Sequence, residues 1–281
     1  MMETIYAFFR SLPVESLHYT FVVRALIAVV LLTPLFGLLG TMAVNHQMAF
    51  FSDALGHSAL TGVGLGMLIG LGREMDLVSM LVFGIIWALL IVAIKRTGAA
   101  SADTVISVFS STSVAAGLVI LASGGGFAKY SSLLIGDILT VTEADLLWLL
   151  LALAGGTVVW ALISNGVLLT SINPSLARSR GIKTRLWEAA FVVLVAVAVM
   201  LSIRWIGVLL INALLIIPAA AGRNMAHTVR QHAVWSVCIA LFSGLAGLFL
   251  SCSTGMSTGP TIVLIAAFFF LVSQIIRSAK K

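Results

Sequence analysis

Apolar residues fall in long runs along nearly the whole chain, separated by short polar breaks. Each run is about the length of a helix that crosses a bilayer, which needs roughly 20 residues. The pattern therefore predicts an all-α, polytopic bundle of eight to nine spans, organised as a single membrane domain over residues 1–281. The runs lie at 21–43, 49–71, 76–94, 103–122, 144–164, 186–203, 206–222, 232–250 and 259–276.

Two segments depart from the simple spanning pattern. The run at 206–222 is short and contains Asn212 and Pro218, so we expect a broken helix, which membranes tolerate where neighbouring helices satisfy the freed backbone groups. Residues 1–17 hold an apolar patch interrupted by Arg10 and Pro13. That patch is too short to span, and we expect an interfacial segment.

Composition supports a membrane protein and argues against an enzyme. Of 281 residues, 60% are hydrophobic and only 9% are charged, against about 25% in soluble domains. The chain has no HExxH or GxSxG motif, so the sequence favours a transport subunit over a catalyst.

The net charge of +6 follows membrane topology rather than nucleic-acid binding, because the basic residues lie beside the apolar runs. If the linker with Lys95 and Arg96 is cytoplasmic, alternation places eleven of the sixteen lysines and arginines inside. This bias predicts an outer N-terminus and an inner C-terminus. The inner set is Lys95, Arg96, Arg178, Arg180, Lys183, Arg185, Arg223, Arg230, Arg277, Lys280 and Lys281.

The run at 49–71, AFFSDALGHSALTGVGLGMLIGL, carries two ionisable residues inside an apolar stretch. One helical turn separates Asp53 from His57, so both side chains leave the same helix face. Such groups are costly at membrane depth and usually face a bundle interior or a substrate path. Carboxylate and imidazole together suit divalent transition metals. Gly62, Gly66 and Gly70 should give the same helix a smooth face for close packing.

Two interpretations of this pair remain open: a metal or proton pathway, and a buried structural pair. Asp53 and His57 alone do not close a zinc site, which usually takes four ligands. Asn212, Asp137 and Glu143 are candidates to complete it, although capping a turn is the commoner role for an aspartate placed like Asp137.

The inner connection at 165–185 predicts a short helix. Asn173 is a plausible N-cap, Pro174 suits the first helical position, and Gly181 is a natural stop. Arg178 rims this helix together with Arg180 and Lys183. It could dock a partner or be an ordinary solvated loop helix.

Two further polar features have structural interpretations. The hydroxyl-rich stretch at 107–113, SVFSSTS, is typical of helices that pack tightly in lipid. Glu188, just inside the run at 186–203, is expected to pair with Arg185 or Lys183.

Three stretches together resemble the membrane subunits of the bacterial zinc/manganese/iron ABC importers. Phe51 to Leu65, FSDALGHSALTGVGL, is similar to the family's Ser-Asp-x-Leu-x-His motif. Leu134 to Leu146, LIGDILTVTEADL, is similar to its Gly-Asp-Ile-Leu-x-Val segment. Gly207 to Ala221, GVLLINALLIIPAAA, is similar to its Gly-Val-Leu-Leu…Pro-Ala run. Weaker likenesses occur at 173–182 and 259–264.

The resemblance implies a type II ABC-importer permease in the bacterial plasma (inner) membrane. It implies a homodimer with two cytoplasmic ATPase subunits, fed by an external metal-binding protein. The cargo would be Zn²⁺ first, with Mn²⁺ or Fe²⁺ next, and no cofactor would be bound permanently. Asp53 and His57 would line the metal path. The 172–182 helix would be the coupling helix that takes up ATPase motion, with contacts from Asn173, Pro174, Leu176, Ala177, Arg178 and Gly181.

Two other functions are kept beside this one. A secondary transporter could use the Asp53–His57 pair as a proton relay, and it would need no ATPase partner. An ABC permease for a metal chelate such as a siderophore should have a wide polar cavity and no such pair.

Overall fold

The computed structural model describes Glu3, Tyr6, Phe8, Phe9 and residues 15–123, 136–172 and 174–279. Every regular element in these residues is a helix, as the apolar pattern predicted. The long helices are α2 (Thr20–Asn45), α3 (Phe51–Leu68), α4 (Asp76–Lys95), α5 (Ala102–Ser123), α8 (Glu143–Ile172), α10 (Thr184–Met225), α11 (Val229–Thr254) and α12 (Thr258–Ala279). Short helices are η1 (Glu15–His18), η2 (Arg73–Met75), η3 (Ile138–Thr140) and α9 (Pro174–Ser179).

Seven of the described helices are long and apolar enough to cross a membrane: α2, α4, α5, α8, α10, α11 and α12. The sequence predicted eight or nine spans, and two features explain the difference. The 42-residue α10 contains a break at Gly207 and combines the expected spans at 186–203 and 206–222. The 18-residue α3 is less apolar because it holds Asp53, His57 and four glycines. Counting α3 and both halves of α10 restores the nine expected segments.

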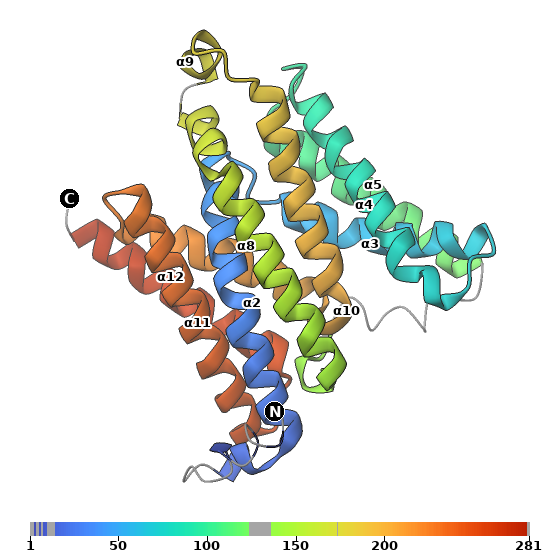
Figure 1. Ribbon diagram of the computed structural model, residues 1–281, viewed down its shortest axis with the longest axis vertical. Helices are drawn as coiled ribbons and strands as arrows, with labels where there is room; N and C mark the ends of the chain where they lie inside the picture. The colour runs from blue at the N-terminus through green and yellow to red at the C-terminus, as the bar shows by residue number, and fades with distance from the viewer. Residues whose placement is uncertain are drawn as a thin grey trace.

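The helices form two lateral groups around a central one (Figure 1). In the centre α2, α8 and α10 pack against one another. On one side α3 packs against both α4 and α5, and on the other α11 and α12 pack together and against α10. The short α9 lies at one end, between α8 and α10 in the chain (Figure 1). Residues of α3 and α10 therefore meet where the central and lateral groups join.

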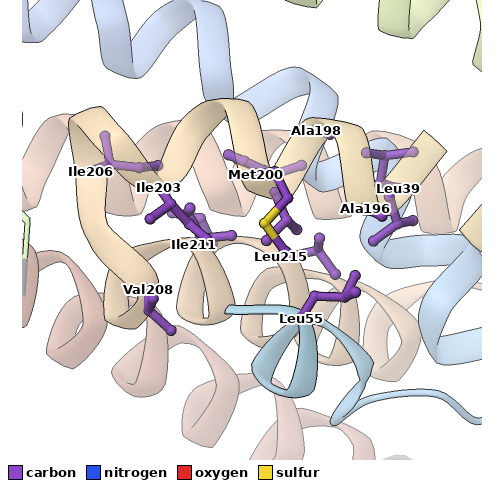
Figure 2. Close-up of a cluster of buried hydrophobic side chains, with 14 of the residues drawn as sticks. Leu39, Leu55, Ala196, Ala198, Met200, Ile203, Ile206, Val208, Ile211 and Leu215 are labelled. Atoms are coloured by element: carbon purple, nitrogen blue, oxygen red, sulfur yellow. The ribbon is translucent and has the colours of Figure 1, made fainter. Parts of the chain in front are cut away.

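The break in α10 turns the helix back on itself. Gly207 has φ 73° and ψ 165°, a conformation that is essentially restricted to glycine. Its two halves, 184–206 and 208–225, lie side by side with apolar side chains between them (Figure 2). There Ile203 and Ile211 come from opposite halves and approach each other, and Leu55 of α3 closes the cluster from below (Figure 2). The break was expected near Asn212 and Pro218, but both residues lie inside the second half.

Several helix ends follow directly from local sequence. Thr142 and Asp145 exchange hydrogen bonds at the start of α8, where Asp145 Oδ2 accepts from Thr142 N at 3.0 Å. Thr228 caps α11 by accepting from Gln231 N at 3.2 Å. Gly255 ends α11 in the left-handed region, as C-terminal glycines commonly do.

Basic residues gather at one end of the bundle. Glu188 of α10 accepts from Lys95 Nζ at 3.1 Å and from Arg96 Nε at 2.9 Å. At the same end Arg223 reaches the Val44 carbonyl, and Arg277 donates to Asn224 Oδ1 at 2.9 Å. This distribution is what the positive-inside rule expects of a cytoplasmic end. The local partners predicted for Glu188 are wrong, because the carboxylate faces the end of α4 instead.

Two sequence expectations need adjustment. The predicted packing face of α3 holds for Gly62 and Gly66, which lie against Ser79 of α4. Gly70 instead lies beyond the end of α3 with φ 79° and open space around it.

Most of residues 1–17, the expected interfacial segment, lie outside the described part of the chain. Among those described, Leu17 packs with Val22 and Val23, and Tyr6 donates to Glu143 Oε1 at 2.8 Å.

Candidate metal site

Asp53 is the centre of the polar cluster inside the bundle. It lies in the first turn of α3, with His57 four residues later on the same face, as the spacing predicted. His57 Nε2 lies 3.4 Å from Asp53 Oδ1. The side chains are 41% exposed for Asp53 and 27% exposed for His57, so neither is fully buried.

Two other helices supply hydrogen bonds to the same carboxylate. Asn212 of α10 donates from Nδ2 to Asp53 Oδ1 at 2.8 Å, and Ser110 of α5 donates to Asp53 Oδ2 at 3.2 Å. Both carboxylate oxygens are therefore engaged by groups from helices that are distant in sequence. Hydrogen-bond donors of this kind hold the carboxylate in a fixed orientation.

Two buried acceptor positions at this cluster lack partners. Among the described residues, neither His57 Nδ1 nor Asn212 Oδ1 has a hydrogen bond, although each atom is shielded from solvent. Buried polar atoms are normally hydrogen-bonded, and an unpartnered one calls for an explanation such as a role in binding. A divalent cation would take electron pairs from nitrogen and oxygen atoms of this kind.

A cavity of about 640 Å³ opens beside Asp53 between α3 and α5. Six of its eight lining residues are polar: Asp53, Asp103, Thr104, Ser107, Ser110 and Ser111. Asp103, Ser107 and Ser111 recur every four residues and so share one face of α5. Hydroxyl and carboxylate groups on an exposed helix face are poorly suited to lipid and well suited to water or hydrated cations.

The other residues proposed to complete the site lie elsewhere. Asp137 accepts a hydrogen bond from Leu139 N at 3.0 Å and caps η3, and Glu143 accepts from Tyr6. Neither lines the cavity at Asp53. Of the three candidates only Asn212 is brought to the Asp53–His57 pair. Within the described residues no group of three or more His, Cys, Asp and Glu side chains is placed so that it could hold a metal ion.

Ser110 was missed by the sequence interpretation, which assigned the 107–113 stretch to helix packing. That interpretation holds for Ser113, which is fully buried and whose carbonyl accepts from Thr61 Oγ1. The four-residue recurrence of polar side chains from Asp103 onward was the available signal for a cavity-facing stripe.

The helix expected at 172–182 is α9, Pro174–Ser179. Its end is a Schellman motif, with Ile182 N bonded to Ala177 O and Gly181 N to Arg178 O, and Gly181 at φ 75°. Ala177 is fully buried, whereas Leu176 is 42% exposed. Arg178 lines a cavity of about 430 Å³ with Lys95, Arg96 and Glu188. The expected N-cap, Asn173, lies outside the described residues.

The sequence matches the model of the ABC 3 transport family over residues 18–277. The chain belongs to this family. This match and the curated relatives described next confirm the resemblance to metal ABC-importer permeases, and with the apolar helices they identify an integral, multi-pass protein of the bacterial inner membrane.

Curated relatives align over nearly the full length. The high-affinity zinc uptake system membrane protein ZnuB of Haemophilus influenzae is 29% identical, covering 89% of this chain and 95% of the relative. The manganese import system permease protein ScaB of Streptococcus parasanguinis is also 29% identical, covering 94% and 93%.

Solved structures support the same fold. The structure described as PsaBC from Streptococcus pneumoniae in complex with Fab has a TM-score of 0.78 and 26% identity, covering 97% of this chain and 95% of the other. An inward-facing conformation of a putative metal-chelate type ABC transporter has a TM-score of 0.69 and 13% identity, covering 90% and 85%. At that identity the second likeness concerns the fold alone.

Proposed function

We propose that this chain is the membrane permease subunit of an ABC importer that moves a divalent transition metal into the cytoplasm. Zinc is the first candidate, with manganese or iron next. ATP hydrolysis would reside on separate cytoplasmic subunits, so the chain itself is a transport subunit and not an enzyme. The observation that carries this proposal is the cluster of Asp53, His57 and Asn212, with its unpartnered nitrogen and oxygen atoms.

In this proposal Asn212 both positions Asp53 and acts as a ligand. Its Nδ2 donates to Asp53 Oδ1. Its Oδ1, which has no hydrogen bond, would present an acceptor oxygen to a cation beside the carboxylate. Asp53, His57 and Asn212 would then offer a carboxylate, an imidazole and an amide, a mixed oxygen and nitrogen set suited to zinc and manganese.

A second copy of the permease would complete the coordination. One chain offers too few ligands for the four that zinc usually takes. The polar stripe of α5 and the open side of Asp53 face the same cavity, and we propose that a second copy covers this side. Metal would pass between the two copies, held weakly enough at each half-site to be released.

The α9 helix and its basic surroundings would contact the ATPase subunits. Leu176 and Arg178 are exposed on α9, while Ala177 anchors it against the bundle. The pairing of Glu188 with Lys95 and Arg96 ties α10 to α4 at the same end. Motion of α9 would therefore reach the helices around the metal path. An external metal-binding protein would deliver the cargo at the opposite end.

Metal content of cells with and without the protein tests the proposal. The cells would be grown under metal limitation, and zinc, manganese and iron would be measured together. We expect zinc to fall most when the protein is absent and to recover with the wild-type chain but not with Asp53→Ala. Co-purification provides the second arm, since uptake that follows a proton gradient without an ATPase partner would favour the proton-relay alternative. Unchanged content of all three metals would contradict the proposal.

A further inference from the structure

The backbones of Gly136 and Gly207 are in direct contact at the end of the bundle opposite the basic residues. Both glycines have positive φ, 62° and 73°. A methyl group added to Gly136 would collide with Gly207 N and with the carbonyl carbon and oxygen of Ile206. The turn at 136–140 is therefore seated on the break between the two halves of α10, with no space for a side chain between them.

Hydrogen bonds within the 136–140 turn and packing against neighbouring helices fix its conformation. Asp137 accepts from Leu139 N at 3.0 Å, and the Asp137 carbonyl accepts from Thr140 Oγ1 at 2.7 Å. Ile138 and Val141 are each only 1% exposed, and η3 packs against α2, α10 and α12. The contact at Gly207 is thus made by an ordered element that can fix the position of the break.

A short path leads from the break to the metal site. Val208 follows Gly207 directly, and its side chain lies against Gly56 of α3, which has no space for a Cβ. Four residues later Asn212 donates to Asp53. Because Gly56 lies between Asp53 and His57 in sequence, both contacts of this half of α10 fall on the turn of α3 that carries the candidate ligands.

We propose that the 136–140 turn is a positioning element for the metal site. By seating the break at Gly207, it sets where Asn212 lies relative to Asp53 and thereby tunes discrimination between metals. This inference rests on the proposed function. In the Gly-Asp-Ile-Leu segment, Asp137 would order the turn and Gly136 would make the contact with Gly207.

The test is a double-mutant cycle on metal selectivity in the full transporter reconstituted in vesicles. Zinc and manganese uptake are measured separately, and the ratio of their apparent KM values is the readout, because a purely structural defect lowers both uptakes without changing the ratio. Gly136→Ala should change the ratio about threefold or more, in the same direction as Asn212→Ala. In the Asn212→Ala background, Gly136→Ala should change it by less than about 1.5-fold.

Gly70→Ala is the matched control. Gly70 also has a positive φ, 79°, but nothing lies within 4 Å of an added methyl. It reproduces the backbone strain without the contact, and it should leave the ratio unchanged. Ile138→Ala is a second way to disturb the 136–140 turn, because it loosens the packing of the turn without altering either glycine.

Three outcomes would overturn the inference. In the first, Gly136→Ala changes the KM ratio no more than Gly70→Ala does. In the second, Gly136→Ala changes the ratio fully in the Asn212→Ala background. In the third, both Gly136→Ala and Ile138→Ala prevent assembly, which would give the turn a structural role only. None of these outcomes would contradict the proposed function, which is supported if the wild type imports metal and Asp53→Ala does not.

Discussion

Asn212 Nδ2 donates a hydrogen bond to Asp53 Oδ1 across 2.8 Å, joining residues 159 positions apart in the chain. The bond links the second half of α10 to the first turn of α3, and it brings together two of the three stretches that resemble metal importers. The third stretch reaches the same place through the contact of Gly136 with Gly207. The three stretches therefore form one connected unit around the candidate metal site.

Removing the Asn212 amide should weaken metal binding without abolishing transport. Asn212→Ala deletes a charge-assisted hydrogen bond and a candidate ligand, so we expect the apparent KM for the preferred metal to rise about tenfold, equivalent to about 1.4 kcal/mol. Ser110→Ala removes the longer bond of 3.2 Å and should have a smaller effect. Uptake kinetics in vesicles measure both. Equal kinetics for Asn212→Ala and wild type would contradict a role for the amide.

The packing of α3 on α10 can be tested by a compensating pair. Gly56→Ala should push Val208 away and separate the helices, costing about 1–3 kcal/mol of stability and lowering uptake. Val208→Ala removes the side chain that the new methyl meets, so the double variant should recover thermal stability and uptake relative to Gly56→Ala. Thermal unfolding in detergent and vesicle uptake are the measurements. No recovery in the double variant would show that the clash lies elsewhere.

Glu188 should contribute to stability at the basic end of the bundle. Its side chain is 12% exposed and pairs with Lys95 and Arg96, whose side chains are 19% and 29% exposed. Glu188→Gln leaves two cations with no carboxylate partner, and losing partly exposed ion pairs of this kind costs about 1 kcal/mol. We expect a lower thermal unfolding midpoint for this variant and little change for Glu74→Gln, whose side chain is exposed. Matching midpoints for the two variants would contradict a stabilising role for the Glu188 ion pairs.

The docking role of α9 can be separated from its folding. Leu176→Asp places a charge on an exposed apolar residue of α9, and it should reduce co-purification of the ATPase subunit while the permease remains folded. Ser175→Asp puts the same charge on the neighbouring exposed position and is the control. Retained ATPase binding by Leu176→Asp would place the docking surface elsewhere.

The features predicted from sequence were those set by local spacing. The apolar runs predicted the helices, and the four-residue interval between Asp53 and His57 predicted that both side chains lie on one helix face. Gly181 was recognised as a helix stop because a left-handed C-terminal residue is usually glycine.

Features that depend on long-range packing could not be found this way. Glu188 has basic residues nearby in sequence, yet its partners lie on α4 because of how the helices cross. Ser110 reaches Asp53 only through the packing of α5 on α3. We expected a broken helix in the run at 206–222 because it contains Asn212 and Pro218. The break occurs at Gly207 because only glycine readily adopts the dihedral angles of the turn.

ATP-driven metal uptake by the full transporter in vesicles tests whether Asp53 and His57 lie on the metal path. Wild type, Asp53→Ala and His57→Ala would be compared, with assembly and ATPase activity measured on the same samples. We expect the wild type to accumulate zinc, and we expect both variants to assemble, to hydrolyse ATP and to fail to accumulate zinc. Zinc accumulation by either variant at the wild-type rate would contradict the assignment of the Asp53–His57 pair to the metal path.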